Sequence, residues 1–223
     1  MKAKANGITI NYRIDGVDGG DWVTLVPGIG NDITFWDALV PVLEGDFRVL
    51  RYDPRGHAGS DAPHGPYSLD DTVGDVTGLW DAVGVERSHI VGLGFGGSTT
   101  IGIGIGHPGR TISLVPCCCR VVMTDEFVAN WHQRLKVVEE LGMEGLGAAT
   151  VERWFTEPFR RNSPEIIEAV RRMFLRTTET GFRGFVAAFL GLDYRAGIDS
   201  IIAPTLLIGG GEDRAKSWRT WPQ

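Results

Sequence analysis

The stretch "SHIVGLGFGG" (residues 88–97) decides how the fold of this chain is interpreted. Its glycines Gly92, Gly94 and Gly97 match G-x-G-x-x-G, the pattern of a phosphate-binding loop. The same residues match G-x-S-x-G, a sharp strand-to-helix turn that carries a nucleophilic serine, with Gly94 at the serine position. The two interpretations predict different proteins, and the surrounding sequence has to distinguish them.

The composition is that of a single globular domain. The chain has 223 residues, of which 43% are hydrophobic and 22% are charged, which is enough for one full core. Its net charge of −6 argues against a nucleic-acid-binding surface, which needs clustered Lys and Arg. No apolar stretch approaches the roughly 20 residues that span a bilayer, and residues 1–16 lack the apolar core of a signal peptide. These features predict a cytoplasmic protein with no nucleic-acid partner and no membrane association.

All three cysteines are consecutive, at Cys117, Cys118 and Cys119. Neighbouring side chains of a strand point to opposite faces, so these thiols cannot converge on one metal ion without distortion. The peptide between neighbouring cysteines also disfavours a disulfide. We therefore expect buried, reduced thiols at the end of a strand and no metal site.

The first half of the chain alternates β-rich and helical stretches. Strands are expected at residues 8–14, 22–28, 47–53, 88–93 and 111–117. Helices are expected at residues 34–45, after Ser68, and from about Gly96. Ser68 is followed three residues later by Asp71, which resembles a capping box. Strand–helix–strand repeats of this length predict an α/β fold with a mainly parallel sheet covered on both faces.

From about residue 120 to residue 197 the pattern becomes helical. Amphipathic helices are expected at residues 125–142, 145–155, 163–177 and 180–193. Ser163 followed by Pro164 is a specific start signal for one of them. The β pattern returns at residues 203–213. The sequence therefore predicts a core made of residues 1–119 and 198–223, with residues 120–197 inserted as a helical cap.

A dinucleotide-binding loop makes a demand that this sequence does not meet. A strand after the loop should end in Asp or Glu about 20 residues on, to bind the ribose hydroxyls. That position falls near Leu114, and the next acid is Asp125. At least three strands also precede the loop, although it usually opens the first βαβ unit. A dinucleotide-binding oxidoreductase therefore ranks last, and no cofactor is predicted.

A nucleophile-bearing turn makes demands that the sequence does meet. The stretch "VPGIG" (26–30) can end an early strand in a loop whose backbone N–H faces an oxyanion. Residues 88–100 supply a strand, a turn and a helix start. Asp213 follows the late strand-like stretch 205–210. Turn first and acid later is the chain order of the α/β-hydrolase fold.

Several stretches together resemble the α/β-hydrolase family, and within it the 3-oxoadipate enol-lactonase group. They are "RYDPRGHAGSD" (51–61), "GPYSLDD" (65–71), "LGFGG" (93–97), "HPGR" (107–110), "WFTEPFR" (154–160) and "IIAPTLLIGGGED" (201–213). The resemblance implies hydrolysis of small esters or lactones beneath a helical cap. It also implies that the backbone N–H groups of Ile29 and Phe95 form the oxyanion hole, and that Asp213 is the acid of a catalytic triad.

The chain departs from the family pattern at the two other triad positions. Gly94 stands where the family has its serine. The family's histidine lies beyond the last strand, and Gln223 ends this chain first, so the resemblance predicts a core that is truncated at its C-terminus. His57, in the "RGH" turn, is the nearest candidate for a stand-in base, although a structural role in the turn is the simpler interpretation.

These departures leave three hypotheses for the function. The first is a protein of the ester or lactone hydrolase type, with impaired or lost activity and a small ester-like or lactone-like ligand. The second is a non-catalytic protein that binds small molecules in the same pocket. The third is a cofactor-free lyase or cyclase that uses the oxyanion donors. The strand at residues 205–209 is expected at an exposed sheet edge, where a second copy of the chain could pair with it.

Overall fold

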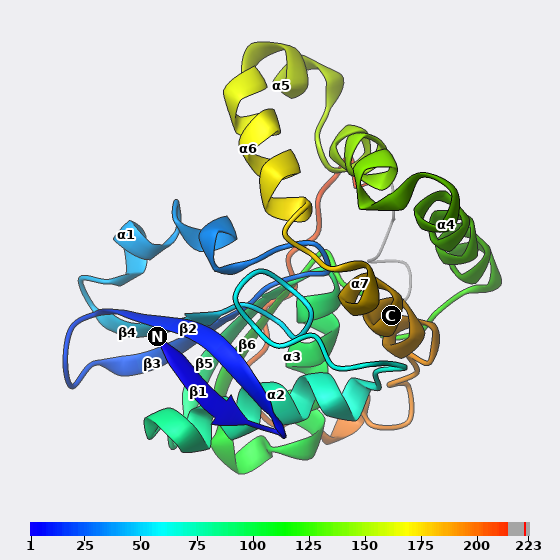
Figure 1. The fold of residues 1–223 in the computed structure, drawn as a ribbon. Coiled ribbons are helices and arrows are strands. Elements are labelled where there is room, and N and C mark those ends of the chain that lie inside the picture. The colour runs from blue at the N-terminus through cyan, green and yellow to red at the C-terminus, as the bar shows by residue number, and fades with distance from the viewer. Residues whose placement is uncertain (214–220, 222–223) are drawn as a thin grey trace.

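A computed structural model describes residues 1–213 and residue 221 (Figure 1). Its strands are β1 (Lys2–Ala5), β2 (Ile8–Gly16), β3 (Asp21–Val26), β4 (Phe47–Tyr52), β5 (Ser88–Leu93) and β6 (Thr111–Cys117). Its α-helices are α1 (Val40–Leu43), α2 (Leu69–Val83), α3 (Phe95–Gly106), α4 (Asp125–Trp154), α5 (Glu157–Asn162), α6 (Pro164–Phe174) and α7 (Glu179–Leu190). Short 3-10 helices lie at Ile33–Trp36 (η1), Pro108–Arg110 (η2) and Ile198–Ser200 (η3).

The strands form one sheet in the order β1-β2-β4-β3-β5-β6. The pairs β1–β2 and β2–β4 are antiparallel, and β4, β3, β5 and β6 run parallel. The register places Val26 beside Gly92 and Leu93 beside Cys117. The chain therefore leaves β3, β5 and β6 at the same edge of the sheet, where the loops that follow these strands meet. The predicted mainly parallel α/β sheet is confirmed.

Residues 204–208 extend this sheet as a short segment parallel to β6. The N–H of Leu114 donates to the carbonyl of Pro204, and the N–H of Leu206 donates back to Leu114. Further along, the N–H of Cys118 donates to the carbonyl of Ile208. The β pattern predicted after residue 203 is therefore present, and it delivers residues 210–213 to the same edge as the loops after β3, β5 and β6.

The two faces of the sheet are covered unequally. Helices α2 and α3 lie on one side of the sheet and α1 lies on the other (Figure 1). The first face buries Trp80, Ile90 and Leu114 completely. The second face is covered by η1 and α1, which bury Val23 and Leu25 of β3 together with neighbouring residues of β4. The second layer is thus thinner and lies mainly over β3 and β4.

The single helix predicted at residues 34–45 is wrong, because this stretch forms η1 and α1 separately. Asp32 caps η1 by accepting a hydrogen bond from the N–H of Thr34. Pro41 lies at the start of α1. Proline has no N–H to donate to the carbonyl four residues earlier, so Pro41 is accommodated in the first turn of a new helix and does not continue η1.

The predicted start of α2 is confirmed. The N–H of Asp71 donates to Ser68 Oγ at 3.1 Å, and the N–H of Ser68 donates to Asp71 Oδ2 at 2.8 Å. Gly84 ends the helix with φ 80°. This reciprocal capping box satisfies two of the N–H groups that a helix start leaves without partners.

The stretch predicted as an inserted cap contains α4, α5, α6 and α7, here called the cap helices, which stand together on one side of the core (Figure 1). The helices predicted at 125–142 and 145–155 are both present as the two halves of α4, which meet at a kink at Gly142 with φ 66° and ψ −171°. Helix α5 is an addition to the predicted set. Ser163 precedes α6, but its side chain makes no capping hydrogen bond.

Of the core segment predicted at residues 198–223, the structure describes residues 198–213 and residue 221. The rest of this segment lies outside the described residues. The assignment of residues 1–119 and 198–223 to one domain and 120–197 to another stays a prediction. Over the described part of the chain, none of the helices combines the length and apolar character needed to cross a membrane.

Candidate active site

Gly94 forms the junction between β5 and α3. Its backbone has φ 57° and ψ −118°, a region in which residues with a side chain are strained. Its N–H donates to the carbonyl of Cys117 at 2.9 Å, which fixes the turn against the end of β6. A Cβ built on Gly94 meets no atom within 4 Å. The residue therefore occupies a sharp strand-to-helix turn whose side-chain position is open.

The other glycines of the motif allow close packing of α3 against the sheet. A Cβ on Gly92 would lie 2.3 Å from the carbonyl oxygen of Gly96. On Gly96 it would lie 2.2 Å from the carbonyl oxygen of Val26, and on Gly97 it would lie 2.5 Å from Cys119 Cβ. Real Cβ atoms do not approach other atoms so closely. Backbone packing thus explains the glycine spacing without a bound phosphate.

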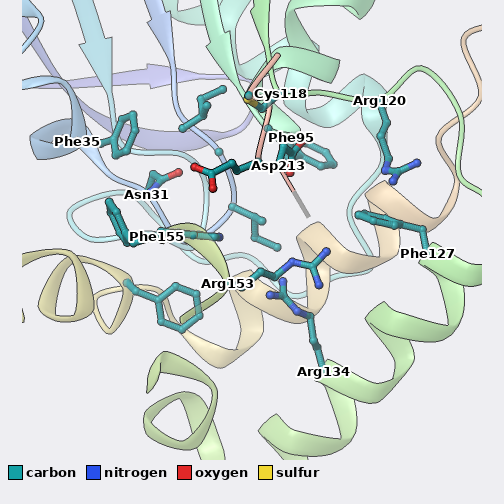
Figure 2. Close-up of a pocket in the computed structure, with 18 of the residues that line it drawn as sticks. Asn31, Phe35, Phe95, Cys118, Arg120, Phe127, Arg134, Arg153, Phe155 and Asp213 are labelled. Atoms are coloured by element: carbon teal, nitrogen blue, oxygen red, sulfur yellow. The ribbon is translucent and has the colours of Figure 1, made fainter. Parts of the chain in front are cut away.

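Gly94 lines a pocket of about 720 Å³ between the sheet edge and the cap helices (Figure 2). The core side of the pocket consists of the loops after β3, β5 and β6 together with residues 210–213. The cap side consists of side chains from α4, α6 and α7 and from residues 155–158. The site therefore lies where loops from separate strands converge under the cap helices.

Both predicted oxyanion donors line this pocket. Ile29 lies in the loop after β3, and Phe95 is the first residue of α3. A first helical residue has no acceptor for its N–H within its own helix. Among the described residues, neither the N–H of Ile29 nor that of Phe95 donates a hydrogen bond. Their role as oxyanion donors stays a prediction, with both groups available for it.

His57 lies behind the loop that carries Ile29 and does not line the pocket. Its Nε2 accepts the N–H of Gly30 at 2.9 Å, and its Nδ1 donates to the carbonyl of Arg55 at 2.9 Å. Complete burial lowers the pKa of His57 to about 4, so the ring is neutral at pH 7. Both ring nitrogens are occupied by backbone groups, which favours the structural turn role, and the role of His57 as a stand-in base stays a prediction.

A charged contact from the cap holds the same loop. The buried carboxylate of Asp32 accepts hydrogen bonds from Arg176 Nε at 2.6 Å and from the N–H of Thr34 at 2.8 Å. Arg176 lies in the connector between α6 and α7, and its carbonyl accepts the N–H of Ala58 at 2.9 Å. One connector of the cap thus holds both the loop after β3 and the turn after β4.

Asp213 follows the edge segment 204–208 and also lines the pocket (Figure 2). Its N–H donates to the carbonyl of Gly210 at 3.1 Å, which forms a tight turn at the end of the segment. Burial lowers the pKa of nearby Arg120, and the negative charge of Asp213 opposes that shift. Asp213 is therefore placed on the core side of the pocket, where its charge acts on Arg120.

The structure thus brings four of the five predicted site residues to one pocket. Gly94, Phe95, Ile29 and Asp213 all line it, and His57 is excluded. Three separate stretches of sequence supply these four residues. Their convergence follows from the parallel order of β3, β5, β6 and the 204–208 segment.

The cysteines differ partly from the expectation. Cys119 is buried, but Cys117 and Cys118 are only half-buried, and Cys118 lines the pocket with φ 46°. Burial raises the pKa of all three thiols, to about 11 for Cys117. The thiols are therefore protonated at neutral pH, and Cys118 is a weak nucleophile.

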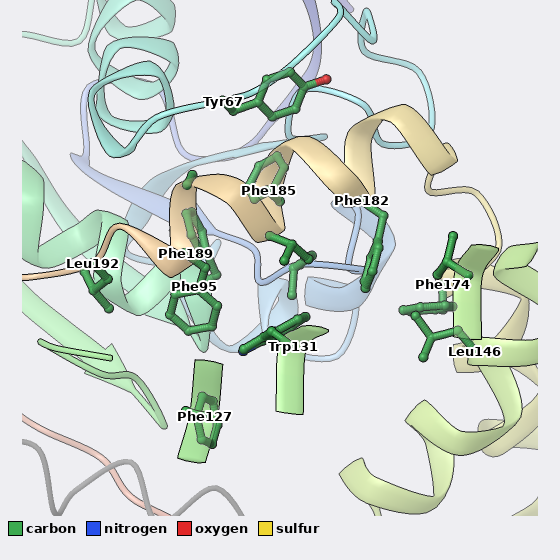
Figure 3. Close-up of a cluster of buried hydrophobic side chains, with 14 residues drawn as sticks. Tyr67, Phe95, Phe127, Trp131, Leu146, Phe174, Phe182, Phe185, Phe189 and Leu192 are labelled. Atoms are coloured by element: carbon green, nitrogen blue, oxygen red, sulfur yellow. The ribbon is translucent and has the colours of Figure 1, made fainter. Parts of the chain in front are cut away.

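Aromatic side chains join the turn to the cap (Figure 3). Phe95 contacts Phe185 and Phe189 of α7 edge-to-face, with ring centroids 5.0 Å apart in each pair. Phe189 in turn contacts Trp131 of α4 with centroids 5.4 Å apart. These edge-to-face contacts give the pocket an apolar wall that includes the first residue after Gly94.

Arg134 and Arg153 are pocket residues that the sequence analysis missed. Helical periodicity offered a signal for the first, because Arg134 lies three residues after Trp131 and so shares its face of α4. No sequence pattern places Arg153 beside it, since Gly142 breaks the helix between them.

Comparison with known proteins finds similarity over most of the chain. Residues 25–223 match the Alpha/beta hydrolase family. The chain is 28% identical to 3-oxoadipate enol-lactonase 1 of Acinetobacter baylyi, over 96% of this chain and 79% of the relative. It superimposes on the enol-lactonase from Burkholderia xenovorans LB400 with a TM-score of 0.94 and 32% identity, over 99% of this chain and 86% of the other. A thermophilic esterase from Thermogutta terrifontis gives a TM-score of 0.88 and 25% identity, over 100% of this chain and 87% of the other.

Proposed function

The chain belongs to the alpha/beta hydrolase family, and on that premise we propose that its pocket binds small carboxylic esters or lactones with their carbonyl group at the Gly94 turn. The observation that carries the proposal is the turn itself. Gly94 has the backbone conformation of a strained strand-to-helix turn and lines a pocket of about 720 Å³. Ile29 and Phe95 line the same pocket, and their N–H groups, which donate to none of the described residues, can stabilise negative charge on the carbonyl oxygen. Similarity to two enol-lactonases supports the ligand class.

We also propose that the chain does not hydrolyse these ligands through a serine nucleophile. That mechanism needs a hydroxyl at the turn and a base to accept its proton. Gly94 supplies no hydroxyl, and the two ring nitrogens of His57 are occupied. Donors and binding alone can still leave roughly 10³- to 10⁴-fold acceleration over water, as in proteases stripped of their triad. Slow residual hydrolysis is therefore the expected behaviour of the unaltered chain.

The test is to return a hydroxyl to the turn. Because a Cβ on Gly94 meets no atom within 4 Å, Gly94→Ser fits without displacing a neighbour, and Gly94→Ala is its matched control. With p-nitrophenyl acetate, we expect a slowly formed acetyl adduct on the peptide containing residue 94 in Gly94→Ser only, with p-nitrophenolate leaving and water taking the serine proton in place of a positioned base. Mass spectrometry after digestion locates the adduct, and circular dichroism verifies that both variants are folded.

The outcomes separate the two parts of the proposal. Efficient turnover by the unaltered chain would overturn the statement that it lacks a nucleophile. Gly94→Ser that folds but gains no adduct would overturn the placement of the carbonyl group at the turn. Rapid turnover by Gly94→Ser would support that placement and would show that another group in the protein acts as the base.

A further inference from the structure

The side chain of Asn31 is a buried polar group of the pocket that lacks a hydrogen-bond partner in the described part of the chain. Asn31 lies in the loop after β3 and lines the pocket, and it is only 3% exposed. Its amide nitrogen Nδ2 is buried and has no partner among the described residues. Most buried polar groups in folded proteins are hydrogen-bonded. An unpartnered group in the lining of a binding pocket therefore points to a group of the ligand as its partner.

The loop holds its shape without help from this side chain. The backbone N–H of Asn31 donates to the carbonyl of Gly28 at 3.1 Å. On one side of Asn31, the N–H of Gly30 donates to His57 Nε2 at 2.9 Å. On the other side, the carboxylate of Asp32 accepts hydrogen bonds from the loop and from the cap. The backbone around Asn31 is thus fixed by its neighbours, and the carboxamide is left for another role.

The carboxamide of Asn31 lies beside the Gly94 turn. A Cβ built on Gly28 would lie 2.9 Å from Asn31 Oδ1 and 2.9 Å from the carbonyl oxygen of Leu93. Leu93 is the last residue of β5 and immediately precedes Gly94. In Figure 2 the Asn31 side chain lies on the core side of the pocket, away from Arg134 on the cap side. The missing side chain of Gly28 therefore leaves room for a carboxamide next to the position proposed for the ligand carbonyl.

The chemistry of this side of the pocket favours a neutral hydroxyl as the partner. Asp213 and Glu212 line the same core side, and their negative charges disfavour an anionic group there. The carboxamide of Asn31 is uncharged, and a half turn of the amide exchanges its acceptor oxygen with its donor nitrogen. A hydroxyl both donates and accepts. It can therefore pair with the carboxamide in either orientation.

We propose that Asn31 is a specificity-determining residue whose carboxamide hydrogen-bonds a hydroxyl next to the ligand carbonyl, so that the pocket prefers 2-hydroxy esters and lactones to their deoxy counterparts. This inference rests on the proposed function, because it takes the ester or lactone carbonyl to lie at the Gly94 turn. The fixed loop holds the carboxamide in place, which reduces the ordering cost of binding. A ligand without the hydroxyl leaves the buried amide unpartnered and should bind more weakly.

Two neutral esters that differ in one hydroxyl test this inference on the unaltered chain. Methyl mandelate carries a hydroxyl next to its carbonyl, and methyl phenylacetate carries a hydrogen in its place. Both carry a phenyl ring that suits the apolar wall of the pocket. We expect calorimetry to show that at least one enantiomer of methyl mandelate binds about fivefold more tightly, the usual scale of one neutral hydrogen bond. Asn31→Leu, which is similar in size but has no polar side-chain atom, should bind the two esters equally.

Stability measurements separate a role in ligand binding from a role in the fold. Because Asn31 Nδ2 has no described partner, Asn31→Leu should unfold at the same urea concentration as the unaltered chain or at a higher one. Asn11→Leu is the matched control, since Asn11 Nδ2 donates to Asp53 Oδ2 at 2.7 Å and neither residue lines the pocket. This control should unfold at a lower urea concentration and keep the preference for methyl mandelate.

The results distinguish this inference from the proposed function. Equal binding of the two esters by the unaltered chain, or a preference that persists in folded Asn31→Leu, would overturn the role of Asn31 while leaving an ester pocket in place. A marked loss of stability in Asn31→Leu would also overturn it, because the side chain would then serve the fold. An Asn31-dependent preference together with a Gly94→Ser variant that gains no acetyl adduct would support the carboxamide site and reject the carbonyl position. If neither ester binds, the carboxamide site fails, and the adduct on Gly94→Ser decides the proposed function separately.

Discussion

His57 accepts the N–H of Gly30 at 2.9 Å, and this contact ties the turn after β4 to the loop after β3. The imidazole is enclosed by protein and donates its other nitrogen to the carbonyl of Arg55. A neutral ring with one donor and one acceptor suits this position, whereas an imidazolium would face the N–H of Gly30 with a second donor. The loop that carries Ile29 is therefore held by a group whose protonation would break the contact.

Acid should weaken the fold through His57. Its pKa is lowered from 6.5 to about 4, so between these values the unfolded chain takes up a proton that the folded chain excludes. The free energy of unfolding should therefore decrease as the pH falls from about 6.5 to about 4, by on the order of 3 kcal/mol, and this contribution should not decrease further below that range. His57→Gln retains a donor and an acceptor but does not titrate. Urea unfolding between about pH 4.5 and pH 7.5 should show a shallower pH dependence in the variant, and identical dependences would contradict the assignment.

The ion pair between Asp32 and Arg176 should stabilise the fold more than an exposed pair does. The carboxylate of Asp32 is 2% exposed and accepts two of its hydrogen bonds from the guanidinium and from Thr34. Arg176→Met leaves a buried carboxylate short of a partner and should cost about 2 kcal/mol. Arg183→Met, which removes an exposed pair with Glu179 on α7, should cost less than about 0.5 kcal/mol. Equal decreases in the free energy of unfolding for the two variants, measured by urea unfolding, would show that the Asp32 contact stabilises the fold no more than an exposed ion pair does.

The glycines of the turn should differ sharply in their tolerance of a side chain. Gly94→Ala places a methyl group in open space and bears only the strain of φ 57°, about 1–3 kcal/mol. Gly96→Ala would push its methyl group to 2.2 Å from the carbonyl oxygen of Val26, which requires α3 to move away from β3. We expect a loss above about 3 kcal/mol or no folded protein for Gly96→Ala. Thermal unfolding of the two variants decides the point, and the reverse order would show that the turn is misassigned.

We expect the edge segment 204–208 to promote self-association. Leu206 and Ile208 donate their N–H groups to carbonyls of β6. Both residues are nevertheless solvent-exposed, Leu206 by 60% and Ile208 by 48%. Among the described residues, no strand pairs with the outer side of this segment. Leu206→Lys places a charge on that edge and should weaken concentration-dependent association in sedimentation velocity by at least about tenfold. A native chain that stays monomeric at all concentrations would refute a self-pairing edge.

Local sequence patterns predicted the elements whose ends are defined by neighbouring residues. The capping box of Ser68 and Asp71 acts within one helical turn, so α2 starts where the sequence indicates. The same kind of reasoning failed at residues 34–45, where η1 and α1 are separate and Pro41 lies in the first turn of α1. The sequence located Gly94 at a turn between a strand and a helix, because a strand–turn–helix pattern is itself local.

The contacts that complete the site were not predictable in this way, because they join residues far apart in sequence. Arg176 reaches Asp32 across 144 positions, and His57 reaches Gly30 across 27. Arg153 joins Arg134 only because the backbone turns at Gly142. The energy of such contacts depends on burial and on charge neighbours, which exist only once the chain is folded.

By itself, then, the sequence determined the alternation of most strands and helices, the bend at Gly94 and the absence of a side-chain hydroxyl there. Alternating and helical periodicities in the sequence indicate which faces of the strands and helices are buried. The absence of a side chain at Gly94 is visible in the sequence itself. The tertiary structure alone decided that both ring nitrogens of His57 contact backbone groups of two loops, and that Arg134 and Arg153 line the same side of the pocket. Both outcomes depend on which side chains are shielded from water. The packing of the cap helices against the sheet edge decides this.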